Sequence, residues 1–153
     1  MQIRLIAVDK LRSRAVADTC AEFRKRLGPY FRYEETEIRA SHGGDPATAM
    51  REEGDRIMKL LRPDERLWLL DRDGAELTSI EFAERMQRCA DEGLSRLTFV
   101  VAGTYGADPA LRARAAFVWS LSRLTFLHEW ARMIVLEQLY RAAKIANNEP
   151  YHH

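Results

Sequence analysis

No stretch of this sequence approaches the roughly 18–20 consecutive apolar residues that a membrane-spanning helix needs. The first residues, Met1–Arg4, lead into an apolar segment that is too short and too interrupted by charge for a signal peptide. We therefore expect a cytoplasmic protein without a membrane partner.

Cysteine is scarce, and its spacing excludes the common cysteine-based sites. Cys20 and Cys89 lie far apart, inside helical patterns, with no CxxC or Cys/His spacing around them. This arrangement favours reduced, half-buried thiols over a disulfide or a zinc site. We expect no bound metal.

A strong charge of one sign is also missing, because the net charge is only +1. Residues 1–93 carry −2 and residues 94–153 carry +3, a difference too small to argue for nucleic acid by itself. Arginine outnumbers lysine 20 to 4. That excess fits phosphate recognition, but it also fits a bias in genome base composition.

What the chain does contain is the pattern of one α/β domain over residues 1–153. Hydrophobic residues make up 46% of the chain, enough for one real core. Apolar, β-prone segments alternate with segments of helical periodicity, which predicts a mainly parallel sheet with helices on both faces. The expected strands are Gln2–Val8, Tyr30–Ile38, Arg66–Leu70, Leu97–Ala102 and Trp119–Phe126; the expected helices run from Ser13 to Leu27, from Asp45 to Leu61, from Thr78 to Gly93, from Asp108 onward, and over Glu129–Ala146.

Two of the expected strands end in glycine-marked loops, and open parallel sheets bind ligands at such ends. The first, Leu70–Gly74, is predicted to form a turn. In the second, Ala102–Gly106, two glycines three residues apart permit close approach of a ligand to the backbone. The loop matches neither GxGxxG nor a phosphate-binding loop with its lysine. A plain tight turn explains it equally well.

The last expected helix is apolar around nearly its whole circumference, which is typical of a helix buried on all sides. In a chain this small, such burial favours a homodimer. His128, Arg132, Glu137 and Arg141 interrupt the apolar surface, and they point either to a ligand or to a satisfied structural network.

The chain closes with Glu149-Pro150-Tyr151-His152-His153. The aromatic and the two histidines could form an ordered lid over a site. Frayed residues, with the last histidines left from a purification tag, are the alternative.

Five segments in this order resemble one known family. They are Phe99–Gly106 (FVVAGTYG), Ser120–Phe126 (SLSRLTF), His128–Arg132 (HEWAR), Glu137–Ala142 (EQLYRA) and Glu149–His152 (EPYH). Together with the total length and the Leu70-Asp71 pair, they resemble the ribosomal RNA large-subunit methyltransferase H family, a small SPOUT-class group. The resemblance covers the whole chain.

This resemblance implies a homodimeric, S-adenosylmethionine-dependent enzyme that methylates N3 of a pseudouridine in 23S rRNA of the assembled ribosome. It also implies a deep trefoil knot in the C-terminal part, which periodicity cannot reveal. Carried over position by position, the cofactor contacts fall on Leu70, Gly103, Ser122, Arg123, Leu124, Thr125, Phe126 and Leu127. The conserved histidine, arginine, tyrosine and histidine of the family correspond to His128, Arg132, Tyr151 and His152.

The residue types suit methyl transfer, which depends mainly on the positioning of donor and acceptor. The acceptor N–H of a uracil ring must lose its proton, and a histidine is a suitable base at neutral pH. We therefore expect His128 or His152 to assist proton removal. Arg132 is expected to bind phosphate or the uracil carbonyl groups.

The chain departs from the family pattern at three positions. Ala102 replaces a glycine, Leu127 replaces a proline, and His153 replaces a final basic residue. Two alternatives therefore stay open: a weakened relative that binds RNA or the ribosome, and a SPOUT enzyme acting on another RNA.

Overall fold

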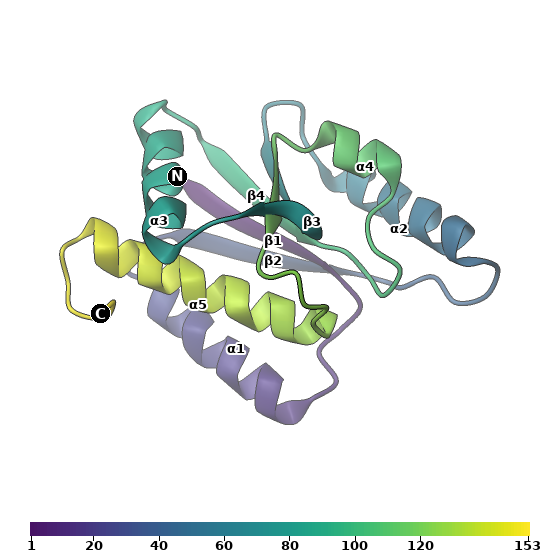
Figure 1. Ribbon diagram of the computed structural model, residues 1–153, viewed down its shortest axis with the longest axis horizontal. Coiled ribbons are helices and arrows are strands. Elements are labelled where there is room, and N and C mark those ends of the chain that lie inside the picture. Colours follow the sequence, from purple (N-terminus) through teal and green to yellow (C-terminus); the bar gives the residue numbers. More distant parts are fainter.

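The computed structural model describes all 153 residues. It contains one five-stranded, all-parallel sheet with helices on both faces (Figure 1). The strand order is β2-β1-β4-β3-β5. The strands are β1 Gln2–Val8, β2 Arg32–Ile38, β3 Arg66–Glu76, β4 Arg96–Val101 and β5 Phe117–Ser120, and the helices are α1 Arg14–Leu27, α2 Pro46–Leu60, α3 Ser79–Asp91, α4 Pro109–Arg114 and α5 His128–Ala146. The predicted α/β class and the alternation of strands and helices are confirmed.

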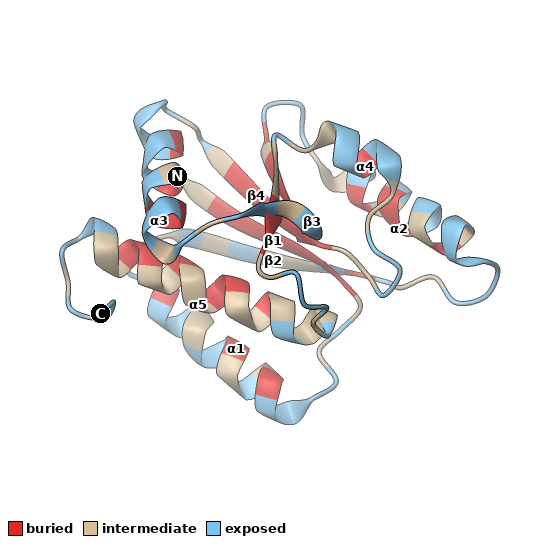
Figure 2. Ribbon diagram, viewed as in Figure 1, coloured by how far each residue is buried: buried red, intermediate tan, exposed pale blue.

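The sheet separates two apolar cores. Helices α1, α3 and α5 cover one face, and α2 and α4 cover the other (Figure 1). Successive residues of a strand serve opposite cores: Leu5 packs with α1, α3 and α5, whereas Ile6 packs with α2 and α4. The central strands β1 and β4 are therefore buried over nearly their whole length and mostly apolar, with Arg4 and Thr98 as buried polar exceptions (Figure 2). Cys20 and Cys89 are buried free thiols in the first core.

Three of the predicted helix starts form as expected. The side chains of Ser13, Asp45 and Thr78 each accept a hydrogen bond from the backbone N–H three residues on. Thr78 and Glu81 complete a capping box. Asp108 precedes α4 but makes no such bond.

The turn predicted after Leu70 is wrong, because β3 continues to Glu76. Trp119 of β5 faces Leu70 and also Ala75, so the intervening residues bulge out of the ladder. Gly74 permits this bulge: a Cβ there would lie 2.5 Å from the Val118 carbonyl oxygen.

The strand predicted over Trp119–Phe126 is also wrong over most of its length, because β5 ends at Ser120. The Ser120 hydroxyl donates to the Ser122 carbonyl (2.9 Å), and the Ser122 hydroxyl accepts from the Leu124 N–H (3.0 Å). These local bonds turn the chain away from the sheet. Residues 121–127 therefore form an irregular connection to α5.

Helix α5 is not buried on all sides within a single chain. The face of α5 toward the sheet is buried in the core that it shares with α1 and α3. By contrast, Trp130 is 49% exposed, and Leu127, just before the helix, is 63% exposed. Together with Leu124, these residues leave an apolar surface uncovered. None of the helices is both long and apolar enough to cross a membrane.

The depth of Leu136 in the first core generates a stability prediction. Leu136→Ala removes a fully buried side chain of α5 and should lower the free energy of unfolding by about 2–5 kcal/mol. Ile80→Ala, at a half-exposed position of α3, is the control and should cost about 0.5 kcal/mol or less. Urea denaturation measures both; equal losses would show that α5 does not carry the core.

Candidate functional site

The candidate site lies along the edge where all five strands end. Since the strands are parallel, the segments that follow Ile38, Val8, Val101 and Ser120 emerge side by side in the sheet order, and Leu70 is where β3 stops pairing with β4 and begins to bulge. Ligands of open parallel sheets bind at this edge. Its two halves differ in character.

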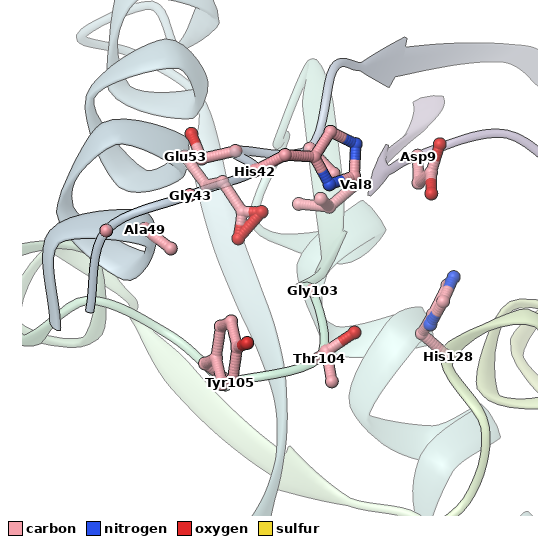
Figure 3. Close-up of a pocket in the computed structure, with 13 residues that line it drawn as sticks. Val8, Asp9, His42, Gly43, Ala49, Glu53, Gly103, Thr104, Tyr105 and His128 are labelled. Carbon is pink, nitrogen blue, oxygen red and sulfur yellow. The ribbon is translucent and has the colours of Figure 1, made fainter. Parts of the chain in front are cut away.

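The half formed by β2, β1 and β4 contains a cavity of about 220 Å³ (Figure 3). Its lining comes from four segments: the end of β1, the loop before α2 with α2 itself, the turn after β4, and the start of α5. The lining residues are Val8, Asp9, Ala40, Ser41, His42, Gly43, Gly44, Ala49, Glu53, Gly103, Thr104, Tyr105 and His128. Asp9 holds a left-handed backbone conformation, φ 71°, which is uncommon outside glycine.

Gly103 is the point where this cavity meets the turn after β4. Its carbonyl accepts a hydrogen bond from the Gly106 N–H (3.0 Å), and Gly106 has φ +90°. A Cβ on Gly103 would lie 2.8 Å and 2.9 Å from the two carboxylate oxygens of Glu53. Because Gly103 has no side chain, the Glu53 carboxylate can lie directly against the backbone of the turn after β4.

Two ionisable side chains line the cavity from different helices. Glu53 enters from α2, near His42, and His128 enters from the first residue of α5, on the side of Asp9 (Figure 3). Burial raises the pKa of the Glu53 carboxyl. A hydrogen bond from the Ser41 N–H and the charges of Arg56 and His42 act in the opposite direction, but burial outweighs them. Glu53 is 5% exposed and takes part in no salt bridge.

The other half of the edge, after β3 and β5, holds most of the expected cofactor residues. The segment Ser122–Leu127 lies beside the β3 bulge: Arg72 donates to the Thr125 hydroxyl (2.8 Å), and Arg123 pairs with Glu76 (3.2 Å). Leu70 lies at the end of the first half of β3, with 9% of its surface exposed.

The expected cofactor residues thus follow three adjacent strands, β4, β3 and β5. Gly103 belongs to both halves, since it also lines the cavity. Neither Leu70 nor any residue of Ser122–Leu127 lines that cavity. The edge accordingly has a cavity at Gly103 and His128, and beside it the irregular segment 121–127, which leads directly into His128.

His128 and Arg132, which were predicted to assist proton removal and to bind the substrate, lie in different surroundings in the fold. His128 faces the cavity, whereas Arg132 is buried and pairs with Glu35 and Glu37 of β2, the latter at 2.6 Å. Its guanidinium is therefore engaged by two carboxylates rather than open to phosphate. For this residue the structural network is the observed arrangement.

Tyr151 and His152 lie at the far end of α5. The Tyr151 hydroxyl donates to Glu137 (3.1 Å), and its ring packs edge-on against Tyr140; His152 Nδ1 is 3.3 Å from Arg141. The tail is therefore ordered against α5 instead of frayed. Its partners Glu137 and Arg141 stand about 14 and 20 Å along α5 from His128, so the tail lies away from the His128 cavity of the same chain.

Sequence reasoning missed Asp9, His42, Glu53 and Tyr105. Asp9 follows a predicted buried strand directly, and the rule for strand ends could have found it. His42 belongs to the loop before α2, next to two glycines, and no motif surrounds it. Glu53 carries no sequence signal, because nothing in the periodicity of α2 tells that its carboxylate turns toward the end of β4.

No group of three or more histidine, cysteine, aspartate or glutamate side chains is arranged to hold a metal ion.

Comparison with known proteins gives one consistent result. A family model described as "Predicted SPOUT methyltransferase" matches residues 1–152. The chain is 42% identical to "Ribosomal RNA large subunit methyltransferase H" of Gloeobacter violaceus, over 100% of this chain and 99% of that protein. It is 41% identical to proteins of the same name from Desulfitobacterium hafniense, over 99% of both chains, and Geotalea daltonii, over 100% of both.

The raised pKa of Glu53 generates a pH-dependent prediction. Glu53→Gln should raise the melting temperature at about pH 8, because it removes a buried charge that has no salt-bridge partner. The folded protein holds the Glu53 proton more tightly than the unfolded chain does. Wild-type stability therefore gains as pH falls through the raised pKa, and the advantage of glutamine shrinks toward pH 4.5.

Thermal melts of wild type and variant between about pH 5 and pH 8 measure this difference. Glu52→Gln is the matched control: the neighbouring side chain is 51% exposed and pairs with Arg56, so its substitution should show no such pH trend. A Glu53→Gln variant that melts lower at high pH would contradict the assignment of an uncompensated charge.

Proposed function

The chain belongs to the SPOUT methyltransferase family and is a methyltransferase, and from this premise we propose that it methylates N3 of a pseudouridine in 23S rRNA. The methyl donor is S-adenosylmethionine, and the substrate is the assembled ribosome in the cytoplasm. The observation that carries the proposal is the edge at Gly103, where the segment after β5 and the cavity of His128 adjoin.

Leu70, Gly103 and Ser122–Leu127 are the residues we assign to the cofactor. Gly103 has no side chain, and residues 121–127 are irregular backbone whose N–H and C=O groups are not all used by a sheet or helix. The exposed side chains of Leu124 and Leu127 add apolar surface for an adenine ring. These backbone groups and apolar side chains can bind a nucleoside, and no charged side chain is needed. When bound, S-adenosylmethionine supplies an electrophilic methyl group on a sulfonium.

His128 is the residue we assign to the proton of the acceptor. In the transfer, the bond from sulfur to the methyl carbon breaks and a bond from N3 to that carbon forms. Sulfur keeps the electron pair as a thioether, and the N3 proton leaves to a base. His128 faces the cavity from the start of α5, next to the cofactor half of the edge, and imidazole accepts a proton at neutral pH.

Arg132 acts in this proposal as a positioning residue. Its ion pairs with Glu35 and Glu37 fix the first turns of α5 against β2. The orientation of His128, one turn earlier, depends on that anchor.

Tyr151 and His152 can contribute to a His128 cavity only if that cavity belongs to a second copy of the chain. Their contacts with Glu137 and Arg141 hold them about 14–20 Å along α5 from His128 of the same chain. The uncovered apolar surface of Leu124, Leu127 and Trp130 is the kind of surface that a homodimer covers. We therefore propose a homodimer in which the tail of one chain completes the site of the other.

The deep trefoil knot also belongs to this proposal. Strand β5 lies at the sheet edge beyond β3, while α5 packs between α1 and α3 over the middle of the sheet (Figure 1). The connection of residues 121–127 must therefore cross the carboxyl edge. A crossing at this point is what threading of the C-terminal part requires.

The second candidate, a weakened relative that binds the ribosome without methylating it, rests on Ala102, Leu127 and His153. Leu127 gives α5 no side-chain cap, unlike Ser13, Asp45 or Thr78 in the earlier helices. Incubation of ribosomes with methyl-labelled S-adenosylmethionine separates the two candidates. Label in 23S rRNA supports the enzyme. Ribosome binding without label, and without cofactor binding in calorimetry, supports the second candidate.

The composite site predicts complementation between two inactive variants. His128→Ala and His152→Ala homodimers should each lose most turnover and keep affinity for S-adenosylmethionine. A purified heterodimer of the two contains one site with both histidines intact, so it should recover about half of the wild-type activity. Differently tagged subunits allow its isolation. A heterodimer as inactive as its parents would mean that His152 does not act across the interface.

A further inference from the structure

The cavity beside Gly103 is lined by no lysine or arginine. Its charged side chains are the carboxylates of Asp9 and Glu53, and its other titratable groups are His42, His128 and Tyr105. Carboxylates repel phosphate, so the cavity suits a neutral group that offers hydrogen-bond donors. Its volume of about 220 Å³ is below the roughly 300–1,000 Å³ of sites for larger ligands, which fits a single ring better than a whole nucleotide cofactor.

Glu53 is the carboxylate in this cavity that has no side-chain partner, and the Ser41 N–H is the backbone group that bonds to it. The other buried glutamate, Glu65, is bonded by Thr98, Arg4 and the Arg62 N–H. No side chain donates a hydrogen bond to Glu53, although only 5% of its surface is exposed. The nearby guanidinium of Arg56 is instead bonded to the Arg39 carbonyl and the Ser41 hydroxyl.

Asp9 differs from Glu53 in this respect. Its carboxylate accepts from the Lys10 N–H (2.9 Å) and from Arg12 (3.0 Å), so its charge is already compensated. A buried carboxylate can accept several hydrogen bonds, and one backbone donor leaves most of that capacity unused. At a cavity wall, Glu53 is therefore the residue that can accept a hydrogen bond from a bound group.

The rim of the cavity adds an aromatic surface. Tyr105 sits on the turn after β4 and is 54% exposed, an uncommon state for a large aromatic side chain (Figure 3). Unstacked bases of RNA are recognised by stacking on such side chains and by hydrogen bonds to their edges. One aromatic face and one free acceptor form the minimum set for holding a flipped base.

We propose that this cavity receives the target base and that the Glu53 carboxylate accepts the N1–H of pseudouridine, with Tyr105 stacking on the ring. The inference rests on the proposed function and adds a residue that determines specificity. Pseudouridine carries a free N1–H because its sugar is attached at C5, whereas the N1 of uridine is bonded to the sugar. Glu53 therefore distinguishes the two bases.

The position of Glu53 favours N1 over N3 as its donor. N3 must face the methyl donor, which belongs to the half of the edge after β3 and β5. Glu53 enters from α2, on the opposite side of Gly103. The part of the ring turned away from the cofactor is thus the part that Glu53 meets, and His128 remains available for the N3 proton.

The test compares wild type and Glu53→Gln on ribosomes with pseudouridine or uridine at the target position. Wild type should prefer pseudouridine in kcat/KM. Glu53→Gln should lower that preference about tenfold, through slower methylation of pseudouridine, since a charged acceptor is exchanged for a neutral one. Glu52→Gln, on the same helix but outside the cavity, should retain the wild-type preference.

Two binding measurements accompany the kinetics in every case. Calorimetry with S-adenosylmethionine should give the same Kd for wild type and Glu53→Gln. Chemical-shift titration with free pseudouridine and uridine nucleosides should show tighter binding of pseudouridine to wild type only. Melting curves verify that the variant is folded.

The outcomes separate this inference from the proposed function. Loss of cofactor affinity in Glu53→Gln, equal loss on both bases, or an unchanged preference would each overturn the role of Glu53. If wild type methylates neither substrate, the proposed function fails; the nucleoside titration still decides whether Glu53 reads the N1–H.

Discussion

Every strand of the sheet runs in the same direction, and this single constraint places five carboxyl ends along one edge. The segments that follow them come from distant parts of the sequence, yet they emerge as neighbours. Asp9, Glu53, Gly103 and His128 meet at this edge because β1, β2 and β4 are adjacent and because α5 begins there. The segment after β5 lies at the same edge, beside the end of β3. An antiparallel strand in the middle of the sheet would separate these groups.

Helix α5 begins at this edge, and its two halves make different contacts. Its first turns carry His128 and are anchored to β2 through Arg132. Its second half holds Tyr151 through Glu137 and Tyr140. The helix rises about 14 Å between His128 and Glu137, so in this structure the tail and the cavity lie at separate places along α5. The homodimer that we propose would bring the tail of one chain to the His128 cavity of the other.

The two halves of the edge also differ in the chemistry they offer. The half near β1 and β2 is acidic, with Glu53 buried and without a salt bridge. The half after β5 exposes backbone and the apolar side chains of Leu124 and Leu127. Gly103 separates them and admits no side chain without displacing Glu53. The proposed function places a nucleoside cofactor on the apolar half and a neutral base on the acidic half, in keeping with these differences.

The sequence by itself determined the fold class, most element boundaries and the helix caps at Ser13, Asp45 and Thr78, because periodicity and capping are local properties. It could not determine the end of β5 or the bulge that spans Gly74, since those depend on which strand pairs at the edge. The motifs after β5 were recognisable by resemblance, but Glu53 was not, because its role arises from contact between α2 and the turn after β4. Only the tertiary structure decided that Arg132 anchors a helix, since its partners Glu35 and Glu37 lie about a hundred residues away in the chain.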